Sequence, residues 1–276
     1  MGRRGRMTNF LFWNIGRQHI TKIVVSLAHQ YDVDVLILAE SNLSVYSLEA
    51  ALNENQKTLY FPDTGYSDQL QIYTRFIGSF FKPLRDSRGI AIRHLIPPVG
   101  KDIIITSVHL SSKLYHRECD QTYSCVRLIK DIEEEEKKVG HTRTIILGDL
   151  NMNPFESGIV SADGLHAISD SRIVKKGHRN VRGKQRRYFY NPMWNFFGDM
   201  RFDPPGTYFY DSGDYVNYYW HMFDQILIRP DLLDFFQTDS LKIITEINGI
   251  SLLLDSGRPD KRKSSDHLPI LFSLNL

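Results

Sequence analysis

Apolar and polar positions alternate along the chain in short blocks, and their lengths predict a mixed α/β structure. Residues 33–39 (VDVLILA) form an apolar run of strand length, typical of a strand that is buried on both faces. From Ile20 to Leu27, apolar residues recur at the i, i+3, i+4, i+7 spacing of one helix face. Further strands are predicted at 10–13, 70–76, 90–96, 103–109, 143–147, 207–210, 223–228, 251–254 and 270–274.

A longer amphipathic segment at 117–139 predicts a second helix. Its apolar stripe consists of Cys125, Leu128, Ile129 and Ile132. The charge run at 133–138 contains Glu–Lys pairs four residues apart, which favour a solvated helix face. Because Cys125 lies on the apolar stripe, we expect a buried thiol there rather than a nucleophile.

The composition is that of a globular protein. Hydrophobic residues make up 42% and charged residues 24% of the chain, which excludes collagen-like and wholly disordered chains. No apolar run approaches the roughly 18 residues that span a membrane, and two cysteines are too few for a disulfide scaffold. The apolar run behind the basic tail at 1–6 is too short for a secretory signal, which favours a cytoplasmic protein. Strands occur in both halves without a Pro/Gly/Ser-rich linker, so we expect one α/β domain at 7–276, with a monomer favoured.

Polar residues occupy the ends of predicted strands, where turn-forming residues would be the simplest choice. They are Asn14, Glu40, His109, Asp149, Asn151, Asp224, Asp266 and His267. Each has a structural alternative: 149–154 can form a turn capped by a side chain, and Glu40 can face solvent. Asp266 and His267 can form a satisfied pair in a loop. As a set, however, strand ends can hold such groups in the fixed positions that catalysis needs.

The candidate ligands in this set are carboxylates and carboxamides, without a Cys/His cluster. Oxygen ligands suit a hard ion such as Mg²⁺ or Mn²⁺ and argue against structural zinc. The histidines near these acids can carry protons or stabilise negative charge near neutral pH. A hard cation with acids and histidines is suited to hydrolysis of a phosphoester.

Six motifs contain these residues and cover the chain from about residue 9 to about residue 272. They are Trp13-Asn14, Leu38-Ala39-Glu40, Ser107-Val108-His109-Leu110, Gly148-Asp149-Leu150-Asn151, Phe223-Asp224-Gln225-Ile226-Leu227 and Ser265-Asp266-His267. Their order and spacing resemble the endonuclease/exonuclease/phosphatase superfamily, which includes DNase I-like nucleases, abasic-site endonucleases, deadenylases, inositol-polyphosphate 5-phosphatases and neutral sphingomyelinases. The resemblance implies a four-layered α/β sandwich, with two mainly antiparallel β-sheets packed face to face and helices outside.

The resemblance also implies a metal site. Glu40 resembles the principal Mg²⁺ ligand, with Asn14 assisting it and Asp266 as a further candidate. The usual Gln-Glu of this motif is Ala39-Glu40 here, which keeps the ligand and loses a neighbouring amide.

Roles in catalysis follow from the resemblance in the same way. Asp149 and Asn151 resemble the pair that orients or deprotonates the attacking water and binds the phosphate. His267 resembles the histidine that contacts the scissile phosphate, with Asp224 as the carboxylate that orients it. The general base is either Asp149 or the Asp–His pair, and the sequence leaves both open. His109, where abasic endonucleases typically have Tyr, is a general acid, a phosphate contact or a core histidine.

The segment at 175–187 (KKGHRNVRGKQRR) contains seven Lys and Arg and no acidic residue, and aromatic residues follow it. Such a segment either tracks a phosphate backbone beside stacking rings or is a solvated loop followed by core aromatics. Its place between two motifs predicts a position at the rim of the site. The candidate phosphate contacts are Arg182, Arg186 and Arg187 in this segment, and Arg75, Arg88 and Lys113 near strand ends.

Three hypotheses follow for function. The first is a Mg²⁺- or Mn²⁺-dependent phosphodiesterase that acts on nucleic acid. The second is a phosphatase or phosphodiesterase that acts on inositol phosphates, lipid headgroups or small nucleotides, because the same site serves them. The third is a catalytically silent binding module, since fold alone does not prove activity.

Overall fold

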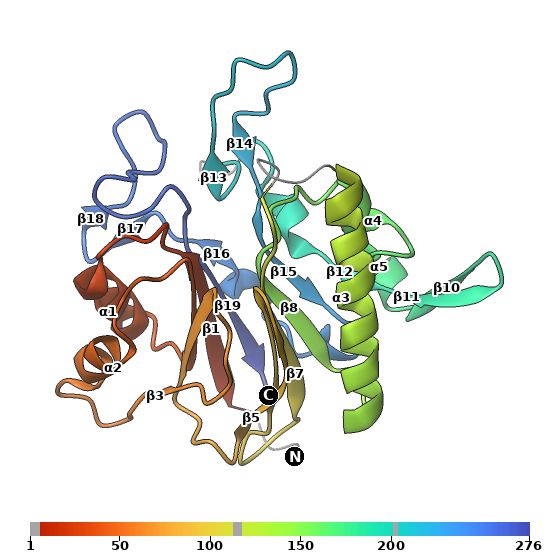
Figure 1. Cartoon of the computed structure of the whole chain (residues 1–276), viewed down its shortest axis with the longest axis horizontal. Coiled ribbons are helices and arrows are strands. Elements are labelled where there is room, and N and C mark those ends of the chain that lie inside the picture. Colours follow the sequence, from red (N-terminus) through yellow and green to blue (C-terminus); the bar gives the residue numbers. More distant parts are fainter. Residues whose placement is uncertain (1–5, 113–117, 201–203) are drawn as a thin grey trace.

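Two β-sheets pack face to face and form the centre of the computed structural model, which describes residues 6–112, 118–200 and 204–276 (Figure 1). The six-stranded sheet has the order β16-β19-β1-β2-β4-β3, and the seven-stranded sheet has the order β5-β6-β7-β8-β15-β12-β9. Antiparallel pairs dominate both sheets. The fold is therefore the DNase I-like α/β sandwich, as the sequence predicts.

In the six-stranded sheet, the first and last strands of the chain are neighbours. Its strands are β1 (Met7–Asn14), β2 (Val35–Ala39), β3 (Phe61–Pro62), β4 (Leu70–Thr74), β16 (Lys242–Ile243) and β19 (Ile270–Asn275). Only β1 and β2 among its neighbouring strands run parallel. The continuous apolar runs of β1 and β2 follow from burial of the strands on both faces.

The seven-stranded sheet contains two parallel pairs, β7–β8 and β12–β9. Its strands are β5 (Phe81–Ser87), β6 (Ile90–Leu95), β7 (Ile103–His109), β8 (Thr144–Asp149), β9 (Ala167–Ile168), β12 (Phe189–Tyr190) and β15 (Asp224–Ile228). Three hairpins lie outside the two sheets. They are β10 (His178–Val181) with β11 (Lys184–Arg187), β13 (Tyr208–Phe209) with β14 (Trp220–His221), and β17 (Glu246–Ile247) with β18 (Ile250–Ser251).

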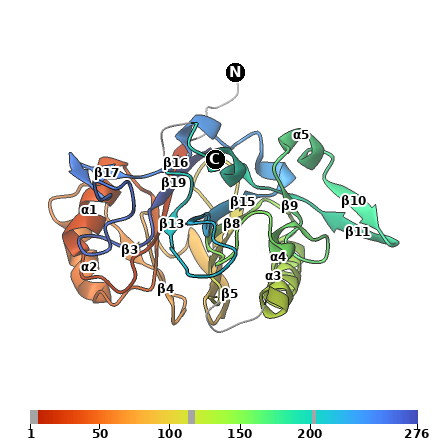
Figure 2. The same ribbon diagram turned by 90° about the horizontal axis from the view of Figure 1, so that it is seen from above.

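Helices cover the outer faces of both sheets (Figures 1 and 2). On the six-stranded sheet lie α1 (Thr21–Gln30) and α2 (Val45–Asn53), and on the other side lie α3 (Glu118–Val139), α4 (Ser157–Val160) and α5 (Ser171–Val174). Short 3-10 helices form at Pro192–Phe196, Pro230–Leu232 and Thr238–Ser240. One large apolar core fills the space between the sheets and under α1 and α2, and a second lies under α3. No helix in the described ranges is long and apolar enough to cross a membrane.

The charge run on α3 differs from its prediction. Glu135 and Glu136 are buried, whereas the sequence predicts a solvated helix face for this run. Glu136 pairs with the fully buried Arg229 at 2.9 Å, and Glu135 accepts from Arg85 at 2.9 Å. Charges without access to water need such partners, and these pairs fix α3 against the sheet. Cys125 is buried as expected, and burial raises the pKa of its thiol to about 12.

The aromatic residues that follow the basic segment belong to the core. Tyr188, Phe189 and Tyr190 are buried, and Phe189 is fully enclosed beneath the guanidinium of Arg229 at 4.1 Å. Of the two alternatives for these rings, the structure supports core packing over base stacking.

Candidate active site

Strand ends from both sheets converge at one edge of the sandwich and bring the predicted polar residues together. In the parallel pair β1–β2, Asn14 ends β1 beside the end of β2, and Glu40 follows directly. The parallel pair β7–β8 places His109 opposite Asp149. Antiparallel β15 begins at the same edge, with Asp224 opposite Asp149.

Asn14 links the acidic residues of the two sheets. Its Nδ2 donates to Asp149 Oδ2 at 3.0 Å and to Glu40 Oε1 at 3.3 Å. His109 Nε2 lies 3.3 Å from Glu40 Oε1 and 3.9 Å from Asp149 Oδ2. Asn14 and Asp149 are buried, whereas the Glu40 side chain is 32% exposed. Glu40 can therefore contact both the buried groups and a ligand from solvent.

Hydrogen bonding decides the charges of Glu40 and His109. The hydrogen bond from His109 lowers the pKa of Glu40 to about 2, although burial acts in the opposite direction. Burial alone would lower the pKa of His109, but the bond to Glu40 and the charge of Asp149 raise it above its ordinary value. A carboxylate facing an imidazolium is thus the favoured state near neutral pH.

Asp224 and His267 form a buried pair. The Nδ1 of His267 donates to Asp224 Oδ2 at 2.8 Å, and its ring lies 4.6 Å from the ring of Tyr208. Burial opposes a charged ring, yet Asp224 and Asp149 raise the pKa of His267 to about 10. Its Nε2 is 3.9 Å from Asp149 Oδ2, beyond hydrogen-bond distance, so this N–H can donate to a ligand oxygen.

A tight turn after β8 orients Asp149. Asn151 has a φ of +49°, and its backbone N–H donates to Asp149 Oδ1 at 2.8 Å. Its side chain Nδ2 donates to the carbonyl of Leu110 at 2.8 Å, which ties the turn to β7. A Cβ on Gly148 would lie 1.9 Å from the carbonyl oxygen of Val108, so only glycine permits this approach of the strands. Burial raises the pKa of Asp149.

The first strand of the chain holds the last motif in place. Trp13 Nε1 donates to the carbonyl of His267 at 2.9 Å, and Ser265 Oγ donates to the carbonyl of Asn14 at 2.7 Å. Asp266 is half-buried, and its Oδ1 lies 3.5 Å from Ser265 Oγ. The last motif therefore joins the same centre as the strand ends.

The donors at this edge suit a hard divalent cation. Glu40 and Asp266 offer partly exposed carboxylates, and carboxylate oxygens of Asp149 and Asp224 lie within 4.8 Å of each other. Asp224 Oδ1 is buried without a hydrogen-bond partner. A donor set dominated by oxygen fits Mg²⁺ or Mn²⁺. The Asn14 amide points its nitrogen toward Glu40, so ligation through its oxygen requires the amide to turn over.

The structure does not bring all predicted phosphate contacts to this edge. Arg75 follows β4, which runs antiparallel to β2, so it lies at the opposite edge from Glu40. There it forms an ion pair with Asp32 and stacks on Tyr60, and its predicted substrate contact is wrong. Arg88 is exposed in the β5–β6 turn, beside Gly89, whose carbonyl accepts from the N–H of His109 at 2.7 Å. It remains a candidate, whereas Lys113 lies outside the described residues.

The basic segment is also displaced from the site. Its predicted contacts, Arg182, Arg186 and Arg187, all lie on the β10–β11 hairpin, which projects from the edge of the molecule (Figure 1). Arg187 donates to Thr142 Oγ1 at 3.2 Å, just before β8 begins, whereas Asp149 ends that strand. The six residues of β8 therefore separate the strand start, near Arg187, from the strand end at Asp149 by roughly 17 Å. The prediction that 175–187 forms the rim of the site is therefore wrong.

Aromatic residues to which the sequence assigns no role lie beside the catalytic edge. Tyr208 stacks on Phe223 at 5.4 Å, and Phe223 stacks on His221 at 4.7 Å. His221 Nδ1 lies 3.1 Å from Asn153 Nδ2. The only sequence signal was their position around Asp224, so their arrangement could not be derived before the fold was known.

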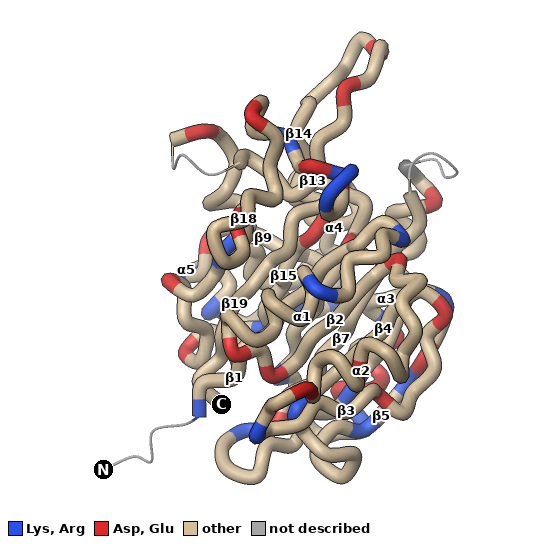
Figure 3. The backbone as a smooth tube through the Cα atoms, turned by 90° about the vertical axis from the view of Figure 1, so that its left-hand side faces the viewer, with Lys and Arg blue, Asp and Glu red and all other residues tan. Residues whose placement is uncertain are grey.

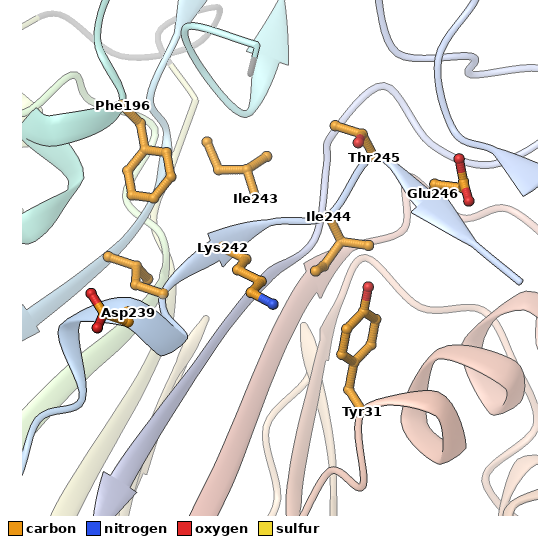
Figure 4. A pocket seen from close by; sticks show the side chains of 9 residues that line it. Tyr31, Phe196, Asp239, Lys242, Ile243, Ile244, Thr245 and Glu246 are labelled. Atoms are coloured by element: carbon orange, nitrogen blue, oxygen red, sulfur yellow. The ribbon is translucent and has the colours of Figure 1, made fainter. Parts of the chain in front are cut away.

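A separate cavity of about 390 Å³ lies between the end of α1 and β16 (Figure 4). Tyr31, Phe196 and Ile244 contribute apolar surface to it, and Lys242 is its basic side chain. None of the residues at the strand ends lines it, so it is distinct from the catalytic edge.

Comparison with known families agrees with this geometry. The model of the Endonuclease/Exonuclease/phosphatase family matches residues 11–267, and the chain belongs to this family. Its enzymes hydrolyse phosphoesters and generally depend on a divalent metal. Comparison with the sequences of curated proteins gives no match.

Solved structures share the fold at low sequence identity. An endonuclease/exonuclease/phosphatase family protein from Leptotrichia buccalis is 14% identical, with a TM-score of 0.58 over 98% of this chain and 100% of that chain. A humanized D. rerio TDP2 is 19% identical, with a TM-score of 0.54 over 98% and 99% of the two chains. D. rerio TDP2 complexed with a single-strand DNA product is also 19% identical, with a TM-score of 0.51 over the same shares.

Proposed function

We propose that this protein is a Mg²⁺- or Mn²⁺-dependent nuclease, a phosphodiesterase in which residues 7–276 form one catalytic domain. The observation that carries the proposal is the joint placement of Glu40, Asp149 and the Asp224–His267 pair at one partly exposed edge. The structural likeness to TDP2, which has been solved with a single-strand DNA product, supports nucleic acid as the substrate class.

Glu40 and Asp266 would hold the cation, with Asn14 beside them. A bound Mg²⁺ or Mn²⁺ neutralises charge on the phosphate oxygens during attack. Glu40 suits this role because its low pKa keeps it ionised near neutral pH. Arg17 Nε, 3.8 Å from Glu40 Oε2, adds positive charge on the exposed side.

Asp149 is the general base in this proposal. Its Oδ1 accepts the N–H of Asn151, and its Oδ2 accepts from Asn14, so the carboxylate has one fixed orientation. Burial raises its pKa, which makes it a stronger base than a solvated aspartate. His267 is less suited to this role, because a pKa of about 10 keeps its ring protonated.

His267 instead donates from Nε2 to a phosphate oxygen and stabilises the charge that develops there. Asp224 fixes the ring through Nδ1 and maintains its charge. His109, protonated beside Glu40, is placed to donate a proton to the departing oxygen.

Incubation with plasmid DNA, single-stranded DNA and single-stranded RNA tests the proposal, each with Mg²⁺, Mn²⁺ or EDTA. We expect cleavage that needs the metal and falls by about 10²–10⁴-fold in Asp149→Asn and His267→Ala. Lys57→Gln, an exposed change far from the site, is the matched control. Cleavage that persists in both variants would refute the site assignment. Hydrolysis of inositol phosphates with nucleic acids left intact would select the phosphatase alternative.

A further inference from the structure

A second cavity, of about 470 Å³, opens directly beside the catalytic edge. Asp266 lines it, together with Phe209 of β13 and residues 258–262 of the segment that follows β18. In Figure 1 this segment and the β13–β14 hairpin both rise above the catalytic edge of the sheets. The cavity is therefore continuous with the candidate metal site and is built from two loops that meet there.

The segment that lines the cavity is held rigidly by its own hydrogen bonds. Asp260 is buried, and its Oδ1 accepts from the backbone N–H groups of Arg262 and Lys263 at 3.1 and 3.3 Å. The carbonyl of Asp260 accepts from Ser264 N at 2.8 Å and from Ser264 Oγ at 3.0 Å. Ser265 then anchors the chain on β1. These hydrogen bonds therefore fix the conformation of the loop up to Asp266.

This fixed loop presents positive charge that the protein does not neutralise. The carboxylate of Asp260 accepts hydrogen bonds from backbone N–H groups and forms an ion pair with Lys263 at 3.6 Å. Arg258, Lys261 and Arg262 are exposed, and no acidic side chain in the described ranges forms an ion pair with them. Over the whole chain, 34 Lys and Arg stand against 32 Asp and Glu, so this local excess is not a property of the whole molecule. Figure 3 shows both basic and acidic residues distributed along the backbone.

The cavity also has an apolar wall. The guanidinium of Arg258 lies 4.2 Å from the ring of Phe209, which fixes the plane of the guanidinium and leaves its N–H edges for a ligand. Leu254 and Pro259 add further apolar surface to the lining. Cations beside apolar surface suit a phosphate group that carries an organic substituent.

We infer that this cavity binds a second, non-scissile phosphate group of the substrate, next to the phosphate that is hydrolysed at His267. The inference rests on the proposed function and extends it. Arg258, Lys261 and Arg262 bind the phosphate oxygens, and Phe209 and Leu254 contact the attached sugar or base. A substrate with one isolated phosphate leaves the cavity without its anion, so the enzyme prefers substrates with at least two phosphates.

Two double variants matched in lost charge test the inference. Arg258→Gln with Arg262→Gln removes two cations from the cavity, and Lys57→Gln with Lys101→Gln removes two exposed cations elsewhere. We expect the cavity variant to lower kcat/KM for a single-stranded oligonucleotide at least tenfold, mostly through KM, with an unchanged melting temperature. The control should stay within twofold. Equal effects of the two variants would overturn the inference.

A substrate series locates the contact. In oligonucleotides that carry one neutral methylphosphonate, we expect a single position next to the cleaved bond to reduce kcat/KM in the wild type. In the cavity variant, the methylphosphonate at that position should reduce kcat/KM little further, because the arginines that bind the phosphate charge are already absent. A loss of the same size in wild type and variant would overturn the inference.

Binding without divalent metal separates this inference from the proposed function. If no nucleic acid is cleaved, fluorescence anisotropy with a labelled dodecamer in EDTA still reports the cavity. The variant should then bind more weakly, with a salt slope smaller by about 1.4 for two lost contacts to a single strand. If the dodecamer binds neither protein, the two sources of phosphate are compared with an inositol bisphosphate and an inositol monophosphate. A preference for the bisphosphate that the cavity variant lacks keeps the inference, and no preference overturns it.

Discussion

The parallel strands β7 and β8 carry a cluster of histidine and carboxylate residues at each end. At one end, His109 and Asp149 belong to the catalytic edge. At the other end, Asp102 precedes β7 and accepts from His94 and His141, each at 2.9 Å. Both ends thus contain residue types that bind metals and transfer protons.

The two clusters differ in how completely their polar groups are satisfied. At the far end, Arg143 pairs with Asp102, and its backbone N–H donates to His141 Nδ1 at 3.2 Å. His141 Nε2 must then carry the proton that Asp102 accepts, which leaves no lone pair of this ring for a metal. Burial lowers the pKa of His141, so its ring is neutral at pH 7. We call this cluster closed, because its polar groups bond to one another and His141 has no lone pair left for a metal.

At the catalytic edge, by contrast, some polar atoms have no hydrogen-bond partner among the described residues. Asp224 Oδ1 and His109 Nδ1 are buried without a hydrogen-bond partner. Asp149 and Asp224 face histidines rather than an arginine, and the His267 ring is charged. Residue types alone therefore do not identify a site. Unsatisfied polar atoms and uncompensated charge distinguish the end that can take a ligand.

The largest expected contrast between the ends is in activity. Asp149→Asn removes the proposed base and should lower kcat/KM by about 10²–10⁴-fold. Asp102→Asn leaves the catalytic edge intact and should change kcat/KM less than about twofold. Both values are measured with Mg²⁺ on the same oligonucleotide. A severe loss of activity in folded Asp102→Asn would contradict the division between the two ends.

The second expected contrast between the two clusters is in metal affinity. Glu40→Gln weakens an oxygen ligand and should reduce Mn²⁺ affinity at least about tenfold. His94→Ala changes only the closed cluster and should bind Mn²⁺ as the wild type does. Isothermal titration of both variants measures this, and a metal-binding event lost only in His94→Ala would reverse the assignment.

Stability should show the opposite order. Asp102→Asn weakens a charge-assisted network and should cost about 1–3 kcal/mol of unfolding free energy. Asp149→Asn should cost less, because burial already raises the pKa of this carboxyl and so disfavours its ionised form in the folded state. Urea denaturation at pH 7 compares them. A greater loss for Asp149→Asn would show that the catalytic carboxylate is the better satisfied of the two.

The last contrast concerns how stability depends on pH. The pKa of His141 is lowered in the folded state, so its contribution is present above about 6.5 and is lost as pH falls below that value. The pKa of His267 is raised to about 10, so its contribution is present below about 6.5 and is lost as pH rises toward 10. Denaturation of His141→Gln and His267→Gln across pH 5.5–9.5 should flatten the acidic limb in the first and the alkaline limb in the second. Wild-type slopes retained in both would contradict these pKa shifts.

Strand direction explains which sequence predictions succeeded. The pattern placed β7 at residues 103–109, as observed, and apolar runs that end in a polar residue located most of the catalytic edge. Arg75 fits the same rule, yet β4 runs antiparallel to β2, so its end lies at the other edge. A sequence shows where a strand ends, whereas the sheet order decides at which edge that end lies.

Partners from distant segments account for the other differences. Glu135 and Glu136 are buried because Arg85 and Arg229, far away in the sequence, reach them. The β10–β11 hairpin has positive φ at both turn residues, Arg182 and Gly183, which Arg-Gly does not signal as Asn-Gly would. The cavity at 258–262 could not be predicted for the same reason, because Phe209 from a distant segment forms part of it. Its basic run nevertheless directly precedes the last motif.

The pairing of β1 with β19 has a consequence for biosynthesis. The ribosome makes β1 long before its partner β19, and Asp266 and His267 lie just ahead of that partner in the chain. Trp13 and Asn14 must therefore wait for the last motif before they can anchor it. A chain released before that point would lack His267 and β19 together. The catalytic edge can therefore be completed only after the last motif has been synthesised and has packed against β1.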